Sequence, residues 1–389
     1  MQRLTGLLQL TFWVTIASVL PGRAFYFYTR NVFAFDQVAN LWIAVGYGLV
    51  YVCGAMLSHR LALRFKERRV LQAMMIGLAV ASAAMGLCIR WPFATITAFI
   101  LSSFFIGGTW PVVESFISAG RSPAETRRAV GRFNLTWSAS FPFPIAAAGQ
   151  LLNAWPEGLF FIPAAIALAM LPIIHPLPMH PTHLPADDPD RPAPDELARL
   201  QRQLRSARWL MLLSYALIFV LVPIFPEILQ NRLGLDVRVA TPLASSVDVA
   251  RFVAFLLLHL WGGWHGRRRW LVAAATLMPV GFFMTLLDAN VPTVLIGAFL
   301  FGLTHGVAYY ASLNYAMVVE NASVEAGGHH EGLIGLSFAL GPGMALVGHA
   351  TNNISFGLIP LITFCILGGM LALRPTGRQR DLAPTDADL

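Results

Sequence analysis

Apolar runs of membrane-spanning length recur along the whole of this 389-residue chain, and they constrain its fold more than any other feature. An α-helix needs about 20 residues to cross the hydrocarbon core of a bilayer. Hydrophobic residues make up 56% of the sequence and charged residues 12%, whereas a soluble domain carries roughly 25% charged residues. The sequence therefore predicts an all-α protein that crosses a membrane many times and has little mass outside it.

Twelve transmembrane helices can be placed in two sets of six. The first set is expected at 4–29, 38–59, 70–89, 92–119, 128–152 and 157–175, and the second at 208–230, 240–263, 270–288, 292–319, 330–352 and 355–373. The expected domains are an N-terminal bundle (1–175), a Pro-rich linker (176–207), a C-terminal bundle (208–374) and a polar tail (375–389). Because proline breaks helices, the linker is expected to be extended up to Asp195 and helical after it.

An internal repeat relates the two sets of helices. With an offset of 200 residues and no gap, identical residues coincide at Asn31 and Asn231, Asp36 and Asp236, His59 and His259, and Pro92 and Pro292. Leu and Ala identities arise easily by chance in apolar sequence, but identities of Asn, Asp, His and Pro in one register do not. The fold is therefore interpreted as two pseudo-symmetric six-helix bundles.

Basic residues predict the orientation of the chain. They lie mostly in short loops on one side of the apolar runs, with an excess of about five to one over the other side, and such an excess marks the cytoplasmic side. Two basic turns contribute Arg64, Arg68, Arg69, Arg267, Arg268 and Arg269. Both termini and the linker are therefore expected in the cytoplasm, for a chain in a bacterial-type inner membrane. Placement in short loops also argues against a nucleic-acid-binding face.

Six spans, a long linker, six more spans, and Arg-rich turns after the second and eighth spans resemble the major facilitator superfamily of secondary transporters. The family turn reads Gly-x-x-x-Asp-Arg-x-Gly-Arg-Arg. The second turn here keeps Gly266-Arg267-Arg268, and the first has Ser58-His59-Arg60 in place of Asp-Arg. Asn134-Leu135-Thr136-Trp137-Ser138 and Gly341-Pro342-Gly343 also resemble family positions. The Gly-Pro signature of proton-coupled drug exporters is absent from span five, where Phe141-Pro142-Phe143-Pro144 stands.

Ionisable residues at membrane depth are candidate transport residues, because burying a charge there is costly unless it has a partner or a function. Asp248 and Arg251 lie three apart, on one helix face. They form either a structural pair or a pair that opens to free Arg251 for an anionic group and Asp248 for a proton. Glu114 is the most isolated acid, with Arg132 as its alternative structural partner. His305 is either a proton relay near the midplane or a packed histidine.

The resemblance implies a substrate site at the midplane between the bundles, lined by spans one, four, seven and ten. Further residues expected to line this cavity are Trp110, Trp137, Tyr309, Tyr310 and Asn314. Arg23 and Glu227, near the outer ends of spans one and seven, either form a gate between the bundles or reach the lipid headgroups.

Catalytic motifs are missing from the sequence, which has neither a Gly-rich phosphate loop nor a nucleophile turn, so an enzyme is not expected. His175, His180 and His183 are the nearest approach to a metal site, but their Pro-rich spacing is poor, and neither a metal nor a cofactor is expected.

The sequence predicts a secondary active transporter that moves a small organic solute by alternating access, coupled to protons and working as a monomer. The alternative is a sensor or assembly scaffold that keeps the fold without transport. Within transport, a multidrug or metabolite exporter and an importer of organic anions or sugars stay open. Arg251 tilts this choice slightly toward an anionic substrate.

Overall fold

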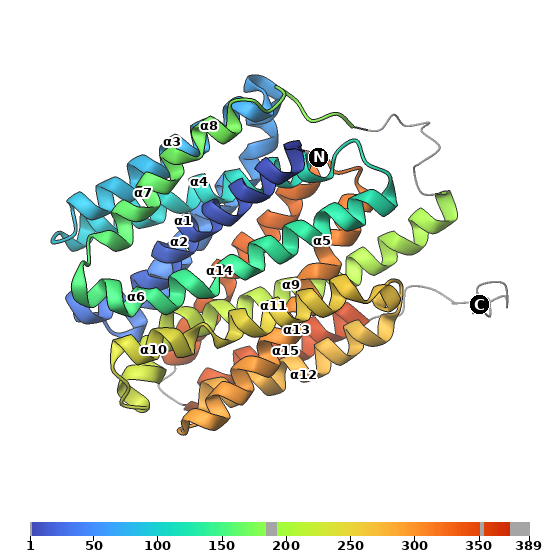
Figure 1. Cartoon of the computed structure of the whole chain (residues 1–389). Helices are drawn as coiled ribbons and strands as arrows, with labels where there is room; N and C mark the ends of the chain where they lie inside the picture. The colour runs from blue at the N-terminus through green and yellow to red at the C-terminus, as the bar shows by residue number, and fades with distance from the viewer. Residues whose placement is uncertain (1, 184–192, 351–353, 374–389) are drawn as a thin grey trace.

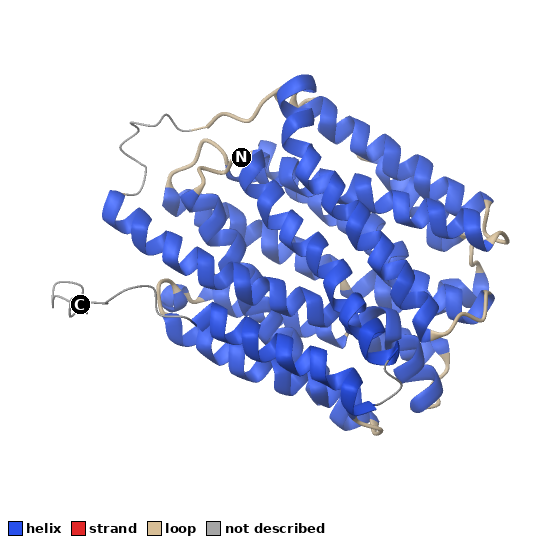
Figure 2. Ribbon diagram, turned by 180° about the vertical axis from the view of Figure 1, so that it is seen from behind, coloured by secondary structure: helices blue, strands red, loops and turns tan. Residues whose placement is uncertain are grey.

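The computed structural model describes residues 2–183, 193–350 and 354–373, and every regular element among them is helical (Figure 2). The helices lie side by side along a common direction (Figure 1). In chain order the elements are α1 (Gln2–Val32), α2 (Gln37–Phe65), α3 (Glu67–Leu87), α4 (Pro92–Ser118), α5 (Pro123–Ser140), α6 (Pro142–Ala154), α7 (Gly158–Ala169), α8 (Leu171–Ile174), α9 (Pro194–Pro226), the π-helix η1 (Glu227–Arg232), α10 (Val237–Ala244), α11 (Ser246–Leu260), the 3₁₀ turn η2 (Gly262–Trp264), α12 (Arg268–Leu287), α13 (Val291–Val319), α14 (Val324–Ala350) and α15 (Ile354–Leu373).

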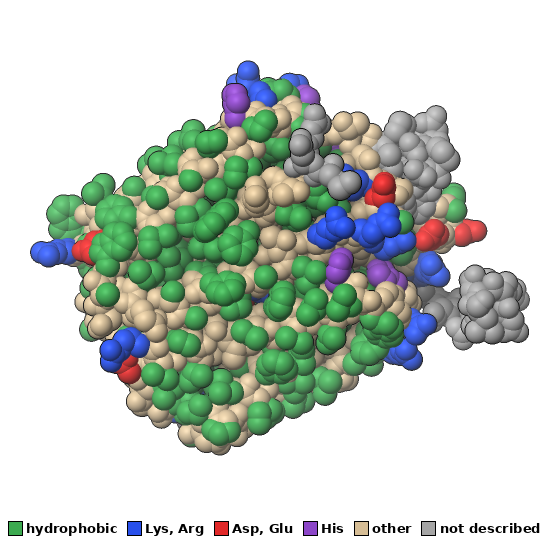
Figure 3. All heavy atoms as spheres, in the orientation of Figure 1, with side chains coloured by type: hydrophobic (Ala, Val, Ile, Leu, Met, Phe, Trp, Pro, Cys, Tyr) green, Lys and Arg blue, Asp and Glu red, His purple; other side chains and the backbone are tan. Residues whose placement is uncertain are grey.

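Each of the twelve expected spans coincides with one helix or with consecutive helices, and the span expected at 240–263 takes in α10, α11 and the start of η2. Among the described residues, nine helices are long and apolar enough to cross a membrane, and two shorter apolar helices occur at Gly158–Ile174 and Pro360–Leu373. On the face shown in Figure 3, apolar side chains cover the middle of the molecule, and most Lys and Arg side chains lie toward its ends. The all-helical membrane class is confirmed, and the grouping into two bundles of six stays a prediction.

Two of the expected spans are broken in the middle. Span five ends its first helix at Ser140 and starts again at Pro142, because proline cannot donate a backbone hydrogen bond but is well suited to the first position of a helix. Span eight breaks at Ser245, three residues after Pro242, so that α11 is a separate helix with Asp248 in its first turn. An acid there interacts favourably with the helix dipole. The two breaks position most of the charged site described below.

The later part of the linker is helical, as expected from Asp195 onward. Helix α9 begins at Pro194 and continues without interruption into the seventh span, so the last part of the expected linker is one helix with that span. Asp195 and Glu196 occupy its first turn, where they suit the helix dipole. The start of the linker packs on the first basic turn, where Arg68 Nη1 donates to the carbonyls of His175 and Leu177, both at 3.0 Å. The expected polar tail (375–389) lies outside the described residues.

Helices of the two expected sets meet along two main seams, α2 with α14 and α5–α6 with α11–α10 (Figure 1). Glycines allow close approach there: a Cβ on Gly335 of α14 would lie 2.8 Å from the ring of Tyr51 on α2. In the second seam the Gly149 N–H donates to the Thr241 hydroxyl at 3.1 Å. Small residues at helix crossings are the usual basis of packing in membranes, where backbones must come close.

Replacing Gly54 by Ala is expected to destabilise the fold by about 1–3 kcal/mol, because the added methyl would overlap the backbone carbonyl of Phe104 on α4. Gly343→Ala is the matched control, since a Cβ on that helical glycine meets nothing within 4 Å. Thermal unfolding of both variants in detergent checks this. Equal melting temperatures for the two variants would contradict the packing described for α2 and α4.

Candidate functional site

A cavity of about 80 Å³ lies at the centre of the helices, between elements of the two expected sets. Its lining is largely aromatic and includes Tyr47, Tyr51, Trp110, Trp137, Phe141, Tyr215, Phe219 and Phe338. Its ionisable lining residues are Arg23, Arg251, His305 and Glu331. Cavities that hold drug-sized ligands have volumes of roughly 300–1,000 Å³, so in this conformation the cavity suits only a small solute.

A triad of charges, Arg23, Asp248 and Arg251, borders the cavity. Asp248 Oδ1 lies 2.9 Å from Arg251 Nη2 and 3.4 Å from Arg23 Nη2, so two guanidinium groups, from α1 and α11, share one carboxylate. Asp248 and Arg251 are buried, with 0% and 1% of their surface exposed. Within the described part of the chain, Asp248 Oδ2 and Arg251 Nε lack a hydrogen-bond partner. The triad therefore carries one net positive charge and free hydrogen-bonding capacity.

Aromatic rings hold Arg251 in place. Its guanidinium carbon lies 4.5 Å from the ring centre of Trp137 and 4.0 Å from that of Phe141, at the break between α5 and α6. Trp137 in turn stacks on Tyr309 of α13, with ring centres 4.7 Å apart and planes 9° from parallel. A cation over an aromatic face is stabilised by about 2 kcal/mol when it is desolvated. The aromatic residues at the break in span five thus hold the buried guanidinium of Arg251 beside the cavity.

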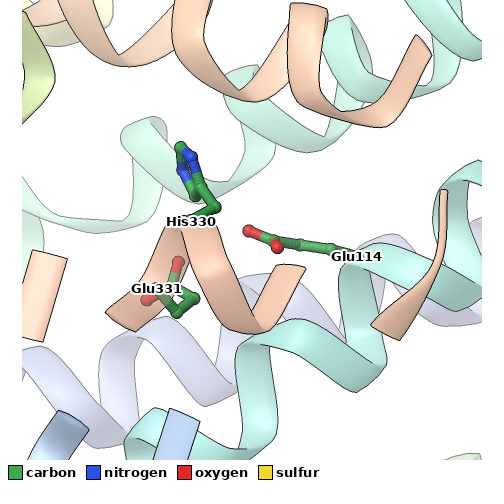
Figure 4. Close-up of side chains that lie close together, drawn as sticks. All are labelled: Glu114, His330 and Glu331. Atoms are coloured by element: carbon green, nitrogen blue, oxygen red, sulfur yellow. The ribbon is translucent and has the colours of Figure 1, made fainter. Parts of the chain in front are cut away.

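A second polar cluster joins Glu114 of α4 to His330 and Glu331 of α14. Figure 4 shows Glu114 extending from α4 toward the turn that carries the other two residues. One potential ligand atom from each residue lies within 4.8 Å of the others, and all three residues are buried. The Tyr51 hydroxyl donates to Glu331 Oε2. Glu331 also lines the central cavity, so the cluster and the cavity are adjacent.

A sequence profile of the Major Facilitator Superfamily matches residues 4–247. The chain belongs to this superfamily. It is an integral membrane protein and a transporter rather than an enzyme, with small molecules as the substrates of its family. No curated protein matches the chain as a close relative in sequence.

Solved structures of superfamily transporters share the fold. The human organic anion transporter MFSD10 (TETRAN) is 14% identical, with a TM-score of 0.68 over 95% of this chain and 97% of its own. FucP in the outward conformation is 14% identical, with a TM-score of 0.66 over 96% of this chain and 99% of its own. A singly substituted form of the E. coli fucose:proton symporter FucP has a TM-score of 0.64 at 14% identity, over 96% of this chain and 98% of its own. At this identity the likeness concerns the fold alone.

The structure of this superfamily member brings some of the expected transport residues to the cavity. Trp110, Trp137, Arg251 and His305 line it, and His305 Nδ1 lies 3.1 Å from the Ser214 hydroxyl oxygen. The other expected lining residues lie elsewhere. Tyr309 packs behind Trp137, Tyr310 packs against Trp264, and Asn314 lines a separate pocket near the second basic turn.

Arg23 turns inward, with 11% of its side chain exposed, and joins Asp248 instead of Glu227 or the membrane surface. Glu227 accepts a hydrogen bond from Asn231 at 2.7 Å on the π-helix. The gate expected between Arg23 and Glu227 is not formed in this conformation and stays a prediction. The inward position gives the cavity a second cation.

The sequence did not predict two residues of the second polar cluster, His330 and Glu331. His330 and Glu331 stand at the expected start of span eleven, where a charge is typical of a loop, but α14 already begins at Val324. A usable signal was the glycines around them, Gly327, Gly328 and Gly332, which permit close packing. Glu114 was expected to be isolated or to pair with Arg132, and the structure places it beside another acid.

Proposed function

We propose that this transporter moves a small organic anion across the membrane by alternating access and that the anion is coupled to a proton. The observation that carries the proposal is the triad at the cavity, in which two arginines share one aspartate. The net positive charge of this buried triad is costly without a counter-ion. Guanidinium groups bind carboxylates and phosphates in a bidentate manner, so a small carboxylate is the simplest group that would neutralise this triad.

Asp248 supplies the coupling. The aspartate and a substrate carboxylate compete for the same two guanidinium groups, so a proton on Asp248 releases Arg23 and Arg251 for the anion. Protonation and anion binding therefore favour each other, and this coupling is reciprocal. Coupling of this sign is what symport of a proton with an anion requires.

The architecture supports a rocking mechanism. The bundles 1–175 and 208–374 would move against each other about the central site, along the seams between α2 and α14 and between α5–α6 and α11–α10. The excess of basic residues on one side supports cytoplasmic termini, in a bacterial-type inner membrane. Because the site is complete within one chain, a monomer suffices.

The two kinds of structural neighbour illustrate the chemistry within reach of this fold. MFSD10 is an organic anion transporter, and FucP couples fucose to protons. For the present chain, the charge of the triad favours the anion over a neutral sugar. Aromatic rings beside the arginines supply an apolar wall that suits the carbon skeleton of a small organic acid.

Proteoliposomes that hold the purified protein and a pH-sensitive dye test the proposal. Small carboxylates are expected to trigger a pH change, and the matching neutral amides are expected to trigger none. Uptake of a labelled carboxylate without any pH change would show that the protein transports the anion without coupling it to a proton. A response to neutral sugars that equals or exceeds the response to carboxylates would overturn the assignment of the substrate class.

A further inference from the structure

Glu114, His330 and Glu331 form a cluster of metal-ligating groups that the proposed anion site does not use. The residues come from two helices, α4 and α14, that belong to different expected bundles. Their potential ligand atoms lie within 4.8 Å of one another, and their exposed fractions are 2%, 0% and 3%. Among the described residues this is the single group of three or more His, Cys, Asp or Glu side chains with such geometry.

The cluster lacks a positive partner in the described part of the chain. Neither glutamate takes part in an ion pair there, the carboxyl groups of Glu114 and Glu331 face each other instead of a cation, and Nε2 of His330 has no hydrogen-bond partner. Two close carboxylates repel each other strongly in a low-dielectric interior. Gly327 leaves the space for this arrangement, because a Cβ there would lie 2.9 Å from Glu114 Oε2.

We propose that this cluster binds a divalent transition-metal ion, with Zn²⁺ as its probe. Two carboxylate oxygens and one imidazole nitrogen suit first-row divalent ions such as Zn²⁺. These ligand atoms lie about 2.0–2.2 Å from the metal in known sites, so three donors that lie within 4.8 Å of one another can share one ion after small side-chain shifts. The second ring nitrogen of His330, Nδ1, lies 3.4 Å from the Ser312 hydroxyl, which would orient the ring with Nε2 toward the ion.

The ion would hold the two helices together. Glu331 lines the central cavity, so an ion can reach the cluster along the route that the solute uses. Once bound, it would link α4 to α14 and oppose the relative movement that alternating access needs. The binding site stands independently of the proposed function, and only this inhibitory effect depends on it.

Calorimetric titration of the purified, chelator-treated protein with Zn²⁺ tests the site. One ion per chain is expected, together with a rise in melting temperature as the site fills. Glu331→Gln and His330→Gln are each expected to weaken binding at least tenfold. Because either variant could disturb the fold, their melting temperatures without metal are measured as well, and a variant counts only if this value stays near that of the wild type.

His180→Gln is the matched control, because His180 is another histidine paired with an acid, at 2.6 Å from Glu67, but it lies on the surface. Binding is expected to be unchanged in this variant. Loss of binding in His180→Gln, unchanged binding in both cluster variants, or no binding by the wild type would overturn the site. If Zn²⁺ binds through the cluster but does not slow anion-driven pH changes in proteoliposomes, the bridging effect is wrong although the site is right.

Discussion

Replacing Arg251 by Gln is expected to weaken binding of the transported anion by roughly 10- to 100-fold, which corresponds to about 1.5–3 kcal/mol for a charged hydrogen bond. Glutamine keeps part of the side-chain volume but removes the charge, so Asp248 and Arg23 would neutralise each other and leave no net charge for the anion. The packing over Trp137 and Phe141 would also lose its cation. The dissociation constant of a carboxylate that is active in the proteoliposome assay is the quantity to measure.

Arg238→Gln provides the control for the loss of one positive charge. Arg238 also pairs with an aspartate, at 2.9 Å from Asp236, but its side chain is 59% exposed. Its loss is expected to leave anion affinity within about twofold, since exposed ion pairs contribute little. Unchanged affinity in Arg251→Gln, or an equal fall in both variants, would show that Arg251 does not bind the substrate.

Replacing Asp248 by Asn is expected to abolish anion-driven proton movement while anion exchange continues. Asparagine has nearly the same shape, but it takes up no proton and competes weakly for Arg23 and Arg251. Anion affinity is therefore expected to stay equal or to rise, and the pH response is expected to fall at least tenfold. Exchange of labelled for unlabelled anion and the dye signal, measured in the same vesicles, separate these two effects.

Asp236→Asn is the companion control for the second prediction. Hydrogen bonds from Arg238 hold the pKa of the Asp236 carboxyl below its ordinary value, so this exposed acid stays ionised at neutral pH and carries no proton. It also caps helix α10 by accepting from the Arg238 N–H, a role that asparagine fills equally well. Coupling is expected to be intact in this variant. If Asp248→Asn retains a full pH response, the proton is bound elsewhere.

The helical segments could be predicted from the sequence because each depends on neighbours within about one turn or one membrane thickness. Apolar runs of about 20 residues define which segments cross the membrane as helices, whatever those helices pack against. The pairing of Asp248 with Arg251 is equally local, since residues three apart share a helix face. The break after Ser140 also had a signal in the sequence, namely Pro142 and Pro144. Span five was nevertheless expected as one continuous helix over 128–152.

Contacts between distant segments could not be predicted in this way. Arg23 could equally have faced lipid headgroups, a gate or the cavity, because its choice depends on how α1 sits against α11, 225 residues away in the chain. Glu114 likewise meets Glu331 only because α4 packs on α14. Hydrophobic periodicity says that a face is buried, but it does not say which of many equally apolar helices will cover it.

The sequence by itself determined that this protein is an all-helical membrane protein with an internal repeat, and it singled out the buried charges Glu114, Asp248 and Arg251. Only the tertiary structure decided which charges meet: two arginines on one aspartate, and two glutamates with a histidine. The physical reason is that crossing a bilayer requires only local apolarity and internal hydrogen bonding, which a single segment can satisfy. Neutralising a buried charge requires a partner within a few ångströms, and in a bundle of helices that partner can come from anywhere in the chain.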